Sequence, residues 1–349
     1  MKTDRSIFLN CLTFSLLLVV CTWIPAMSQD TTSLPKENFY TKSLHYTNRG
    51  IVSAYSKERG GLERLTGMSA KEIGCEKSEC HATTCDVCHK KVVDGKATYT
   101  LDTAIAYAAC TNCHGDMAKD NPDVHFAKGM KCMDCHTTRE IHGDGTEVAT
   151  YAQPGFFDVR CEKCHTNLSQ SISHTVHAGK LDCTPCHVQE VNTCYNCHVD
   201  TRLKKGKESS IQLKNMEFLV NHDGKVTLAN FLSYVYQNKT MMTFGPTFPH
   251  RVVKVGRTCT DCHDTKIVRD VKEGKFAPVR WENEKLQNVN GVVPVYDVAK
   301  WNCVFLTKEN NKWIPLKDPV EPLVNYSGYC SPLTNDQITK LAAPQAAKK

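Results

Sequence analysis

The sequence predicts a mostly irregular fold of short α-helices, with a small β-rich lobe at the C-terminal end. Three observations support this expectation. The 349 residues include 20 cysteines and 15 histidines, far more thiol than a reduced cytosolic enzyme carries. A short cysteine–histidine motif recurs between residues 75 and 263 and leaves little room there for long helices or sheets. Residues 264–349 lack this motif and contain short runs of strand-forming residues.

Residues 1–28 are typical of a secretory signal peptide. Lys2 and Arg5 precede a mostly apolar run at 7–24, and small residues occupy the −3 and −1 positions before Gln29. An uncleaved anchor helix is the alternative, because the run is just long enough to span a bilayer. We expect cleavage and a periplasmic or secreted, extracellular protein. Residues 29–72 form a polar lead-in.

The motif C-x-x-C-H organises residues 73–263. Seven motifs lie within 75–198 and the eighth at 259–263. The seven regular copies are Cys85/Cys88/His89, Cys110/Cys113/His114, Cys132/Cys135/His136, Cys161/Cys164/His165, Cys183/Cys186/His187, Cys194/Cys197/His198 and Cys259/Cys262/His263. A stretched C-x4-C-H copy consists of Cys75, Cys80 and His81.

The spacing of this motif is what covalent haem c requires. Residues three apart on a helical turn share a face, so both thiols reach the vinyl groups on one edge of a porphyrin. The following histidine then binds the iron. A zinc array would need four ligands per metal and would not require that histidine. The sequence therefore predicts eight covalent haems c and a multihaem cytochrome c fold at 73–263.

The segment ISHTVHAGKLDCTPCH at 172–187 resembles tetrahaem cytochromes c3, in which paired histidines precede a C-x-x-C-H motif. The stretched motif also occurs in that family. The total of eight is nearer to the octahaem cytochromes, which include hydroxylamine oxidoreductase-like and tetrathionate reductase-like enzymes. The chain lacks the C-x-x-C-K motif of octahaem nitrite reductases. The resemblance implies electron transfer through several haems.

Seven histidines lie outside the motifs and are candidates for the second axial position of the irons: His45, His125, His142, His174, His177, His222 and His250. A second imidazole makes a haem iron a low-spin electron carrier. His174 and His177 are three residues apart, so one helical face presents both, and we expect them to serve different haems. Seven candidates cannot serve eight irons. One haem is therefore open, bound by another side chain, or bound by a neighbouring chain.

Residues 264–349 form the predicted haem-free lobe and tail. Runs around Trp281, Trp301 and Trp313 indicate short strands. Cys303 and Cys330 are the two mature cysteines outside the motifs, and they either form a disulfide or act as redox thiols.

The formal charge of +6 and the absence of a strongly basic stretch exclude nucleic-acid binding. We expect an electron carrier of the cell envelope, or one that serves extracellular acceptors. Its partners would be quinol-linked cytochromes, reductases or other redox proteins, through which it could associate with a membrane. A multihaem reductase with one open haem, acting on a small nitrogen or sulfur oxyanion, is the alternative, although no set of residues in the sequence indicates a proton-delivery site for catalysis. A filament subunit that lends His45 to its neighbour is a narrower form of the first hypothesis.

Overall fold

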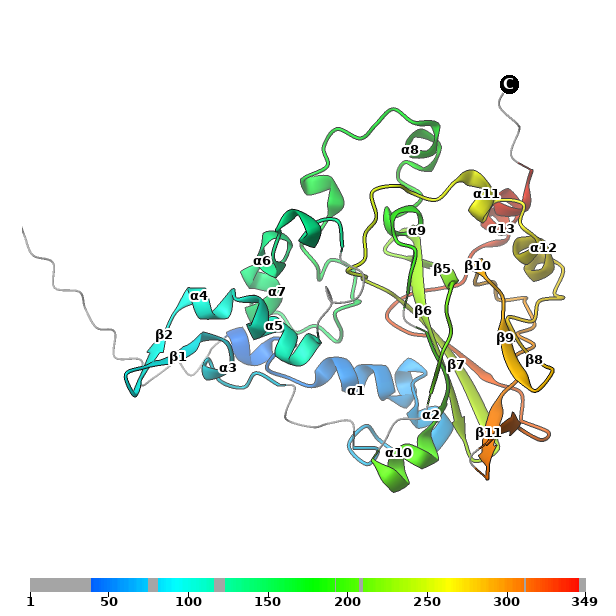
Figure 1. The fold of residues 1–349 in the computed structure, drawn as a ribbon, viewed down its shortest axis with the longest axis horizontal. Coiled ribbons are helices and arrows are strands. Elements are labelled where there is room, and N and C mark those ends of the chain that lie inside the picture. Colours follow the sequence, from blue (N-terminus) through cyan, green and yellow to red (C-terminus); the bar gives the residue numbers. More distant parts are fainter. Residues whose placement is uncertain are drawn as a thin grey trace, which may run out of the picture. The chain divides into compact units, whose positions relative to one another are not determined.

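The computed structural model describes residues 39–74, 81–115, 123–191, 193–206, 210–310 and 312–344 (Figure 1). The expected signal peptide and the cysteines of the stretched motif, Cys75 and Cys80, lie outside these residues. Among the described residues, no helix has both the length and the apolar character needed to cross a bilayer.

Short helices carry most of the motifs in the first half of the described chain. They are α1 (Arg49–Tyr55), α2 (Glu63–Thr66), α3 (Asp86–His89), α4 (Leu101–Ala104), α5 (Tyr107–His114), α6 (Cys132–Cys135), α7 (Thr138–His142), α8 (Ile172–His177) and α9 (Thr184–His187). Single 3-10 turns lie at η1 (Phe39–Lys42), η2 (Lys57–Arg59), η4 (Phe126–Lys128) and η5 (Cys161–Lys163). A hairpin of β1 (Lys90–Val93) and β2 (Lys96–Tyr99) follows α3.

These helices are short because polar caps and glycines bound them closely. In α7 the hydroxyl of Thr137 accepts a hydrogen bond from the Glu140 amide, and the Glu140 carboxylate accepts one from the Thr137 amide. The helix ends at Gly143, which has a φ of 76° that only glycine adopts without strain.

A seven-stranded sheet forms the largest element (Figure 1). It contains β3 (Thr193–His198), β4 (Ile211–Gln212), β5 (Met216–His222), β6 (Lys225–Tyr236), β7 (Lys239–Pro246), β10 (Gly291–Pro294) and β13 (Leu323–Tyr326). The long strand β6 pairs antiparallel with β5 along its first half, parallel with β3 along its second half, and antiparallel with β7 on its other edge. Strands β10 and β13 extend the sheet in parallel beyond β5 and β7.

Aromatic side chains fill the core of this sheet. Phe218, Phe231 and Phe244 are fully buried, and their ring centroids lie 4.8 to 5.3 Å apart. Trp301 packs 5.0 Å from Phe244 and joins the C-terminal segment to the same core. Packing of this kind contributes the main favourable free energy of folding.

The predicted fold class is wrong. Of the residues that the structure describes, strands account for 25% and helices for 29%, and the main sheet curls into a half-barrel, so the fold is not mostly helical. The reason lies in residues 211–258, whose strands form the centre of a large sheet although they fall within the predicted multihaem region. Burial alternates along most of β6, which is the pattern of a strand with one face in a protein core.

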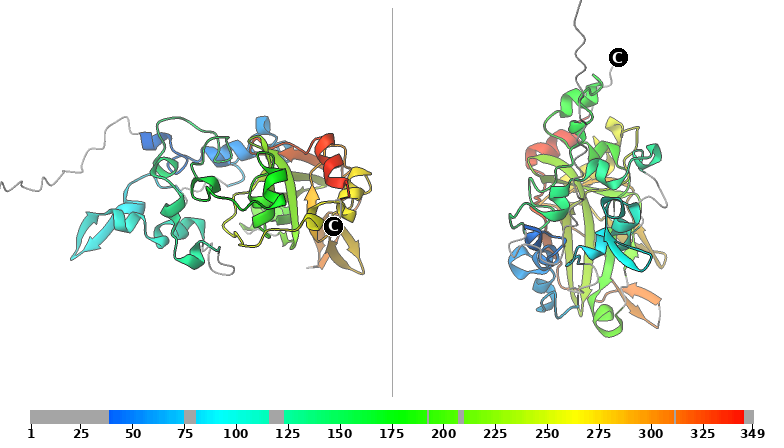
Figure 2. Two further views of the ribbon diagram at one scale, coloured as in Figure 1. Left: turned by 90° about the horizontal axis from the view of Figure 1, so that it is seen from above. Right: turned by 90° about the vertical axis from the view of Figure 1, so that its left-hand side faces the viewer.

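The remaining elements lie on or beside the sheet (Figure 2). The helices are α10 (Val199–Lys205), α11 (Cys259–Cys262), α12 (Lys266–Lys272) and α13 (Asn335–Ala342). Two hairpins are formed by β8 (Val279–Glu282) with β9 (Lys285–Asn288) and by β11 (Leu306–Glu309) with β12 (Lys312–Pro315).

Candidate haem sites

Six pairs of imidazole rings face one another, and each pair joins one motif histidine to one histidine outside the motifs. The ring centroids are separated by 6.1 Å in His114–His45, 6.0 Å in His89–His142, 5.9 Å in His136–His250, 6.0 Å in His165–His125, 6.3 Å in His187–His174 and 6.0 Å in His263–His177. Two imidazole nitrogens on opposite sides of one metal ion, each about 2 Å from it, place the centroids about 6 Å apart. The six pairs therefore have the spacing of bis-histidine iron.

The hydrogen bonds of these rings leave the correct nitrogen for a metal. In six of the twelve imidazoles Nδ1 is hydrogen bonded, so that Nε2 is the nitrogen left for the metal. These hydrogen bonds join Nδ1 of His125 to Asp123 (2.7 Å), of His136 to Glu140 (2.8 Å), of His174 to Ser169 O (3.0 Å), of His177 to Ser173 O (2.9 Å), of His187 to Val253 O (3.1 Å) and of His263 to Lys340 O (3.3 Å). Metal-bound histidines commonly have this arrangement, because the second-shell partner fixes the tautomer and the ring orientation.

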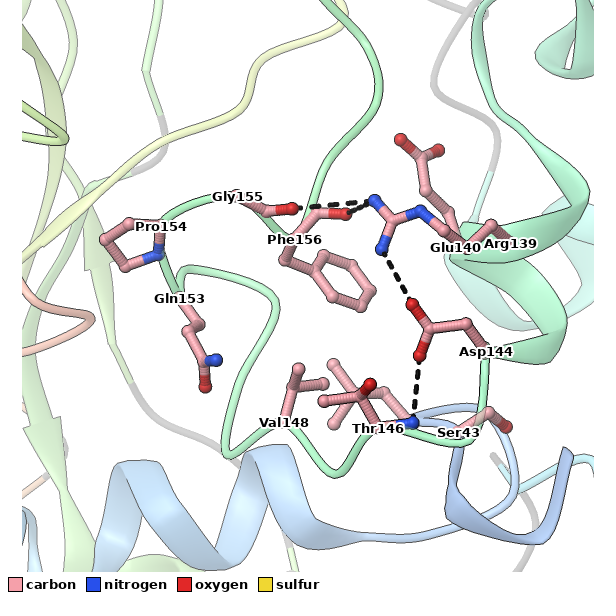
Figure 3. Close-up of a pocket in the computed structure, with 12 residues that line it drawn as sticks. Ser43, Arg139, Glu140, Asp144, Thr146, Val148, Gln153, Pro154, Gly155 and Phe156 are labelled. Carbon is pink, nitrogen blue, oxygen red and sulfur yellow. Dashed lines mark hydrogen bonds and ion pairs between the residues drawn. The ribbon is translucent and has the colours of Figure 1, made fainter. Parts of the chain in front are cut away.

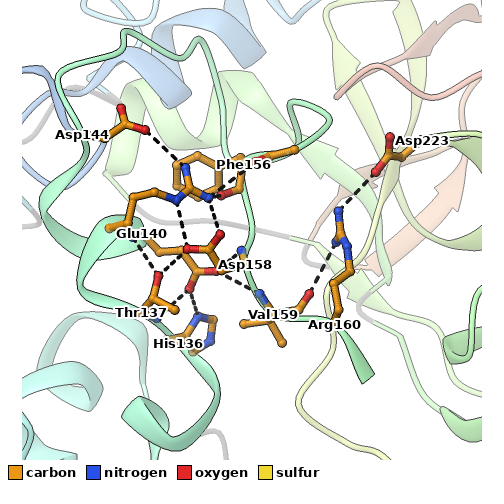
Figure 4. A network of polar contacts seen from close by, with 11 residues as sticks. His136, Thr137, Glu140, Asp144, Phe156, Asp158, Val159, Arg160 and Asp223 are labelled. Atoms are coloured by element: carbon orange, nitrogen blue, oxygen red, sulfur yellow. Dashed lines mark hydrogen bonds and ion pairs between the residues drawn. The ribbon is translucent and has the colours of Figure 1, made fainter. Parts of the chain in front are cut away.

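The partner of His136 is a buried carboxylate, and it lies in a dense polar network (Figure 4). Glu140 is 3% exposed. Its Oε2 accepts hydrogen bonds from His136 Nδ1 and the Thr137 amide, and its Oε1 accepts from the amides of Asp158 and Val159. Four donors fix this negative charge directly behind the imidazole.

Asp123 holds His125 in the same way. Its carboxylate accepts from both the backbone amide and Nδ1 of His125, at 2.8 and 2.7 Å. The other oxygen accepts from the Val252 amide at 2.7 Å. Asp123 is 6% exposed, so this charge is also held in place and shielded from water. Val252 lies two residues after His250, so this contact also brings the ligand segments 123–125 and 250–252 together.

Cysteines of paired sites that are neighbours in the sequence, with the motif at 194–198 left out, interact electrostatically. Interacting thiol pairs join Cys88 to Cys113, Cys110 to Cys132, Cys135 to Cys164, Cys161 to Cys183, and Cys186 to Cys262. Burial and then the adjacent Cys132 raise the pKa of Cys110 to about 11. Burial and then Cys186 raise the pKa of Cys262 to about 12. These interactions link each of the six paired sites to the next one along the sequence.

Three candidate histidines do not face another imidazole within the part of the chain that the structure describes. His222 directs Nε2 to the carbonyl of Ala152 at 2.7 Å. His198 directs Nε2 to the carbonyl of Leu306 at 2.8 Å. His81 has a buried Nε2 without a hydrogen-bond partner. The structure thus pairs six of the seven candidate second ligands and leaves His222 engaged elsewhere.

A cavity of about 150 Å³ lies beside the Glu140 network, lined by residues that include Ser43, Thr146 and Phe156 (Figure 3). Its cationic side chain is already paired: Arg139 binds both carboxylate oxygens of Asp158 at 2.9 Å and lies 3.6 Å from Asp144. Hydrogen bonds from Arg139 and Thr137 lower the pKa of Asp158 to about 2. The arrangement is that of a structural clamp, and it offers no unpaired cation to an anionic substrate.

Cys303 and Cys330 are not bonded to each other. Burial raises the pKa of both thiols to about 12. Cys330 Sγ lies 3.5 Å from the carbonyl of Phe244, inside the sheet core. A protonated, buried thiol is a poor nucleophile, so these residues pack as small apolar side chains.

Comparisons with known proteins agree with the motifs. Residues 116–166 match the family described as cytochrome c554 and c-prime. The chain is 29% identical over 185 residues to the high-molecular-weight cytochrome c of Nitratidesulfovibrio vulgaris, which covers 47% of this chain. The chain spans about a third, 32%, of that relative. No solved structure matches. These similarities support a multihaem c-type cytochrome that binds haem covalently and transfers electrons.

Proposed function

We propose that the protein is an exported electron carrier in which six bis-histidine haems c form one continuous chain. The six imidazole pairs at 5.9 to 6.3 Å carry this proposal. Each bound haem supplies an iron that takes up or releases one electron without binding substrate. The protein's part is to hold both axial nitrogens, fix their tautomers and keep the irons closed to small molecules.

The order of the sites supports a chain rather than isolated centres. Helix α8 bears the second ligands of two neighbouring sites, since His174 faces His187 and His177 faces His263. Arg257 lies just before the last motif and donates hydrogen bonds to the carbonyls of Pro185 and Val188, which flank His187. Short segments shared between sites keep their separations small, and electron tunnelling requires such proximity.

The proposed location is the periplasm or the exterior of the cell, because haem c attachment and the signal peptide expected at 1–28 are both typical of exported proteins. The proposed partners are other redox proteins, such as quinol-linked cytochromes and reductases, or extracellular acceptors. His45 faces His114 of its own chain, so we assign it to that site and not to a haem of a neighbouring subunit, as the filament hypothesis requires. Burial and then the nearby His114 lower the pKa of His45, which favours the neutral imidazole that a metal needs.

One observation favours a multihaem reductase as the second candidate. His81 follows the stretched motif, and within the described residues no imidazole faces it. A haem held there would offer an open position to a small nitrogen or sulfur oxyanion. The pocket beside Glu140 gives this alternative no support, because Arg139 is fully engaged.

Electron paramagnetic resonance of the oxidised protein tests the proposal. We expect at least six low-spin haems whose signals do not change with nitrite, sulfite or hydroxylamine. His174→Ala should convert one low-spin haem to high spin. The matched control His222→Ala should leave the spectrum unchanged, because His222 Nε2 is bonded to a carbonyl. A wild-type spectrum dominated by high-spin haem would overturn the proposal, and so would equal spectra of the two variants.

A further inference from the structure

We infer that the motif at Cys194, Cys197 and His198 does not bind haem and instead fastens the C-terminal segment to the sheet, so that the protein carries no more than seven haems. This inference rests on the proposed attachment of haem at the other motifs. It follows from four features of strand β3.

The first feature is the backbone conformation. The other regular motifs contain a helical turn, in α3, α5, α6, η5, α9 and α11. Residues 193–198 are a strand, paired in parallel with β6 through Cys194–Leu232 and Cys197–Tyr234. In a helical turn residues three apart are neighbours on one face, whereas an irregularity in the pairing of β3 with β6 lies between Cys194 and Cys197, and Asn196 has a φ of 60°. This motif therefore lacks the helical turn that the other regular motifs share.

The second feature is the nitrogen that an iron would need. His198 is 9% exposed, and its Nε2 lies 2.8 Å from the carbonyl oxygen of Leu306. The imidazole also packs 5.3 Å from the ring of Trp313. In the six paired imidazoles whose ring hydrogen bond is defined, Nδ1 is bonded instead. The Leu306 carbonyl lies against the nitrogen that a metal would have to bind.

The third feature is a closed polar network around Asn196, which lies between the two cysteines and is fully buried. Its side chain accepts from the Leu306 amide at 2.8 Å and donates to the Leu306 carbonyl at 3.0 Å. The backbone amide of Asn196 donates a hydrogen bond to the hydroxyl of Ser233 at 2.7 Å. Inserting a porphyrin would leave several of these buried groups without partners, and each loss is costly.

The fourth feature is the packing of Tyr195, the residue after Cys194, in the hydrophobic core. Tyr195 is fully buried, and its ring lies 6.0 Å from Phe305 and 6.1 Å from Phe231. Its hydroxyl donates to the carbonyl of Val304. Tyr195, Asn196 and His198 therefore bind three consecutive residues, 304–306, and hold that segment against the sheet.

The chain of sites also bypasses this motif. The backbone amide of Arg257, two residues before the motif at 259–263, donates a hydrogen bond to the carbonyl of Cys186 at 3.0 Å. The site at 183–187 is therefore followed in space by the site at 259–263, although the motif at 194–198 is nearer in the sequence.

Peptide mapping of the exported holoprotein gives a direct test, because trypsin releases residues 181–202 as one peptide that contains two motifs. We expect this peptide to carry one haem, an added mass of about 616 Da, with Cys194 and Cys197 unmodified. An added mass of about 1,232 Da, two haems, would overturn the inference. A peptide without haem would overturn the proposed function and with it the premise of the inference.

Paired variants provide a second measurement on the intact protein. Replacing Cys194 and Cys197 by serine should leave the total haem count unchanged. The matched double replacement of Cys183 and Cys186 by serine should remove one haem. Loss of one haem from both variants would contradict the inference. If either variant fails to fold, the wild-type peptide still decides the question.

Discussion

Replacement of Glu140 by glutamine removes a buried negative charge from behind one axial imidazole. Glu140 Oε2 lies 2.8 Å from His136 Nδ1. Adding the width of the ring and a metal–nitrogen bond places the carboxylate about 7 Å from the metal. At an effective dielectric constant of about 20, a unit charge at that distance contributes about 2.4 kcal/mol.

That energy corresponds to about 100 mV for one electron. The carboxylate stabilises the oxidised iron, so its removal should raise the reduction potential of one haem by about this amount and leave its spin state unchanged. A spectroelectrochemical titration of wild type and Glu140→Gln measures the shift. Glu282→Gln is the matched control, because Glu282 is an exposed hairpin carboxylate that loses the same charge.

The glutamine amide would also face the His136 Nδ1–H group as a second donor, and the lost hydrogen bond should cost about 1 to 3 kcal/mol of folding free energy. Thermal unfolding shows whether the variant is folded at the temperature of the titration. If Glu140→Gln is folded and all its potentials equal those of wild type, the reasoning about this carboxylate is wrong.

Three further predictions concern stability. Arg257→Met should lower the free energy of unfolding by about 3 to 5 kcal/mol in denaturant titrations, because Glu217, 3.2 Å away and 4% exposed, loses its partner. The pKa of Glu217 is already raised by burial. Adding Glu217→Gln to Arg257→Met should therefore recover part of the lost free energy of unfolding. A double variant as unstable as Arg257→Met would contradict this explanation. Asp158→Asn should lower the melting temperature at pH 6 but not near pH 2. Folding lowers the pKa of Asp158 to about 2, so its carboxylate stabilises the folded protein at pH values above the pKa of the unfolded chain. This stabilisation is lost as the pH falls through about 2. An equal deficit at both pH values would refute the assignment. Asn196→Ala should cost about 2 to 4 kcal/mol, the sum of the buried bonds to Leu306, with no change in haem count; a haem lost from this variant would argue against the structural role of Asn196.

The helical turns at most of the motifs could be predicted from the sequence, because they are local. Two cysteines three residues apart and the histidine that follows lie within one turn, and a cap such as Thr137 with Glu140 is complete within four residues. The placement of His174 and His177 on one helical face depends on the same short range. Such features need no knowledge of the rest of the chain.

The sheet could not be assigned in the same way. Residues 211–258 have strand-forming composition, but only their pairing with 193–198, 291–294 and 323–326 makes them the centre of seven strands. That pairing joins residues 16 to 82 positions apart in the sequence, and the burial of Phe218 and Phe244 follows from it. The propensity of a single segment does not carry this information.

The sequence by itself determined the chemistry that the chain offers: paired thiols, a histidine after each pair, and seven further imidazoles. The tertiary structure alone decided which imidazoles meet, for example His136 with His250 across 114 residues of chain. It also gave one motif, at 194–198, a strand in place of a turn. The physical reason is that ligand geometry and burial are set by contacts between distant segments, which can override the conformation that a five-residue pattern favours.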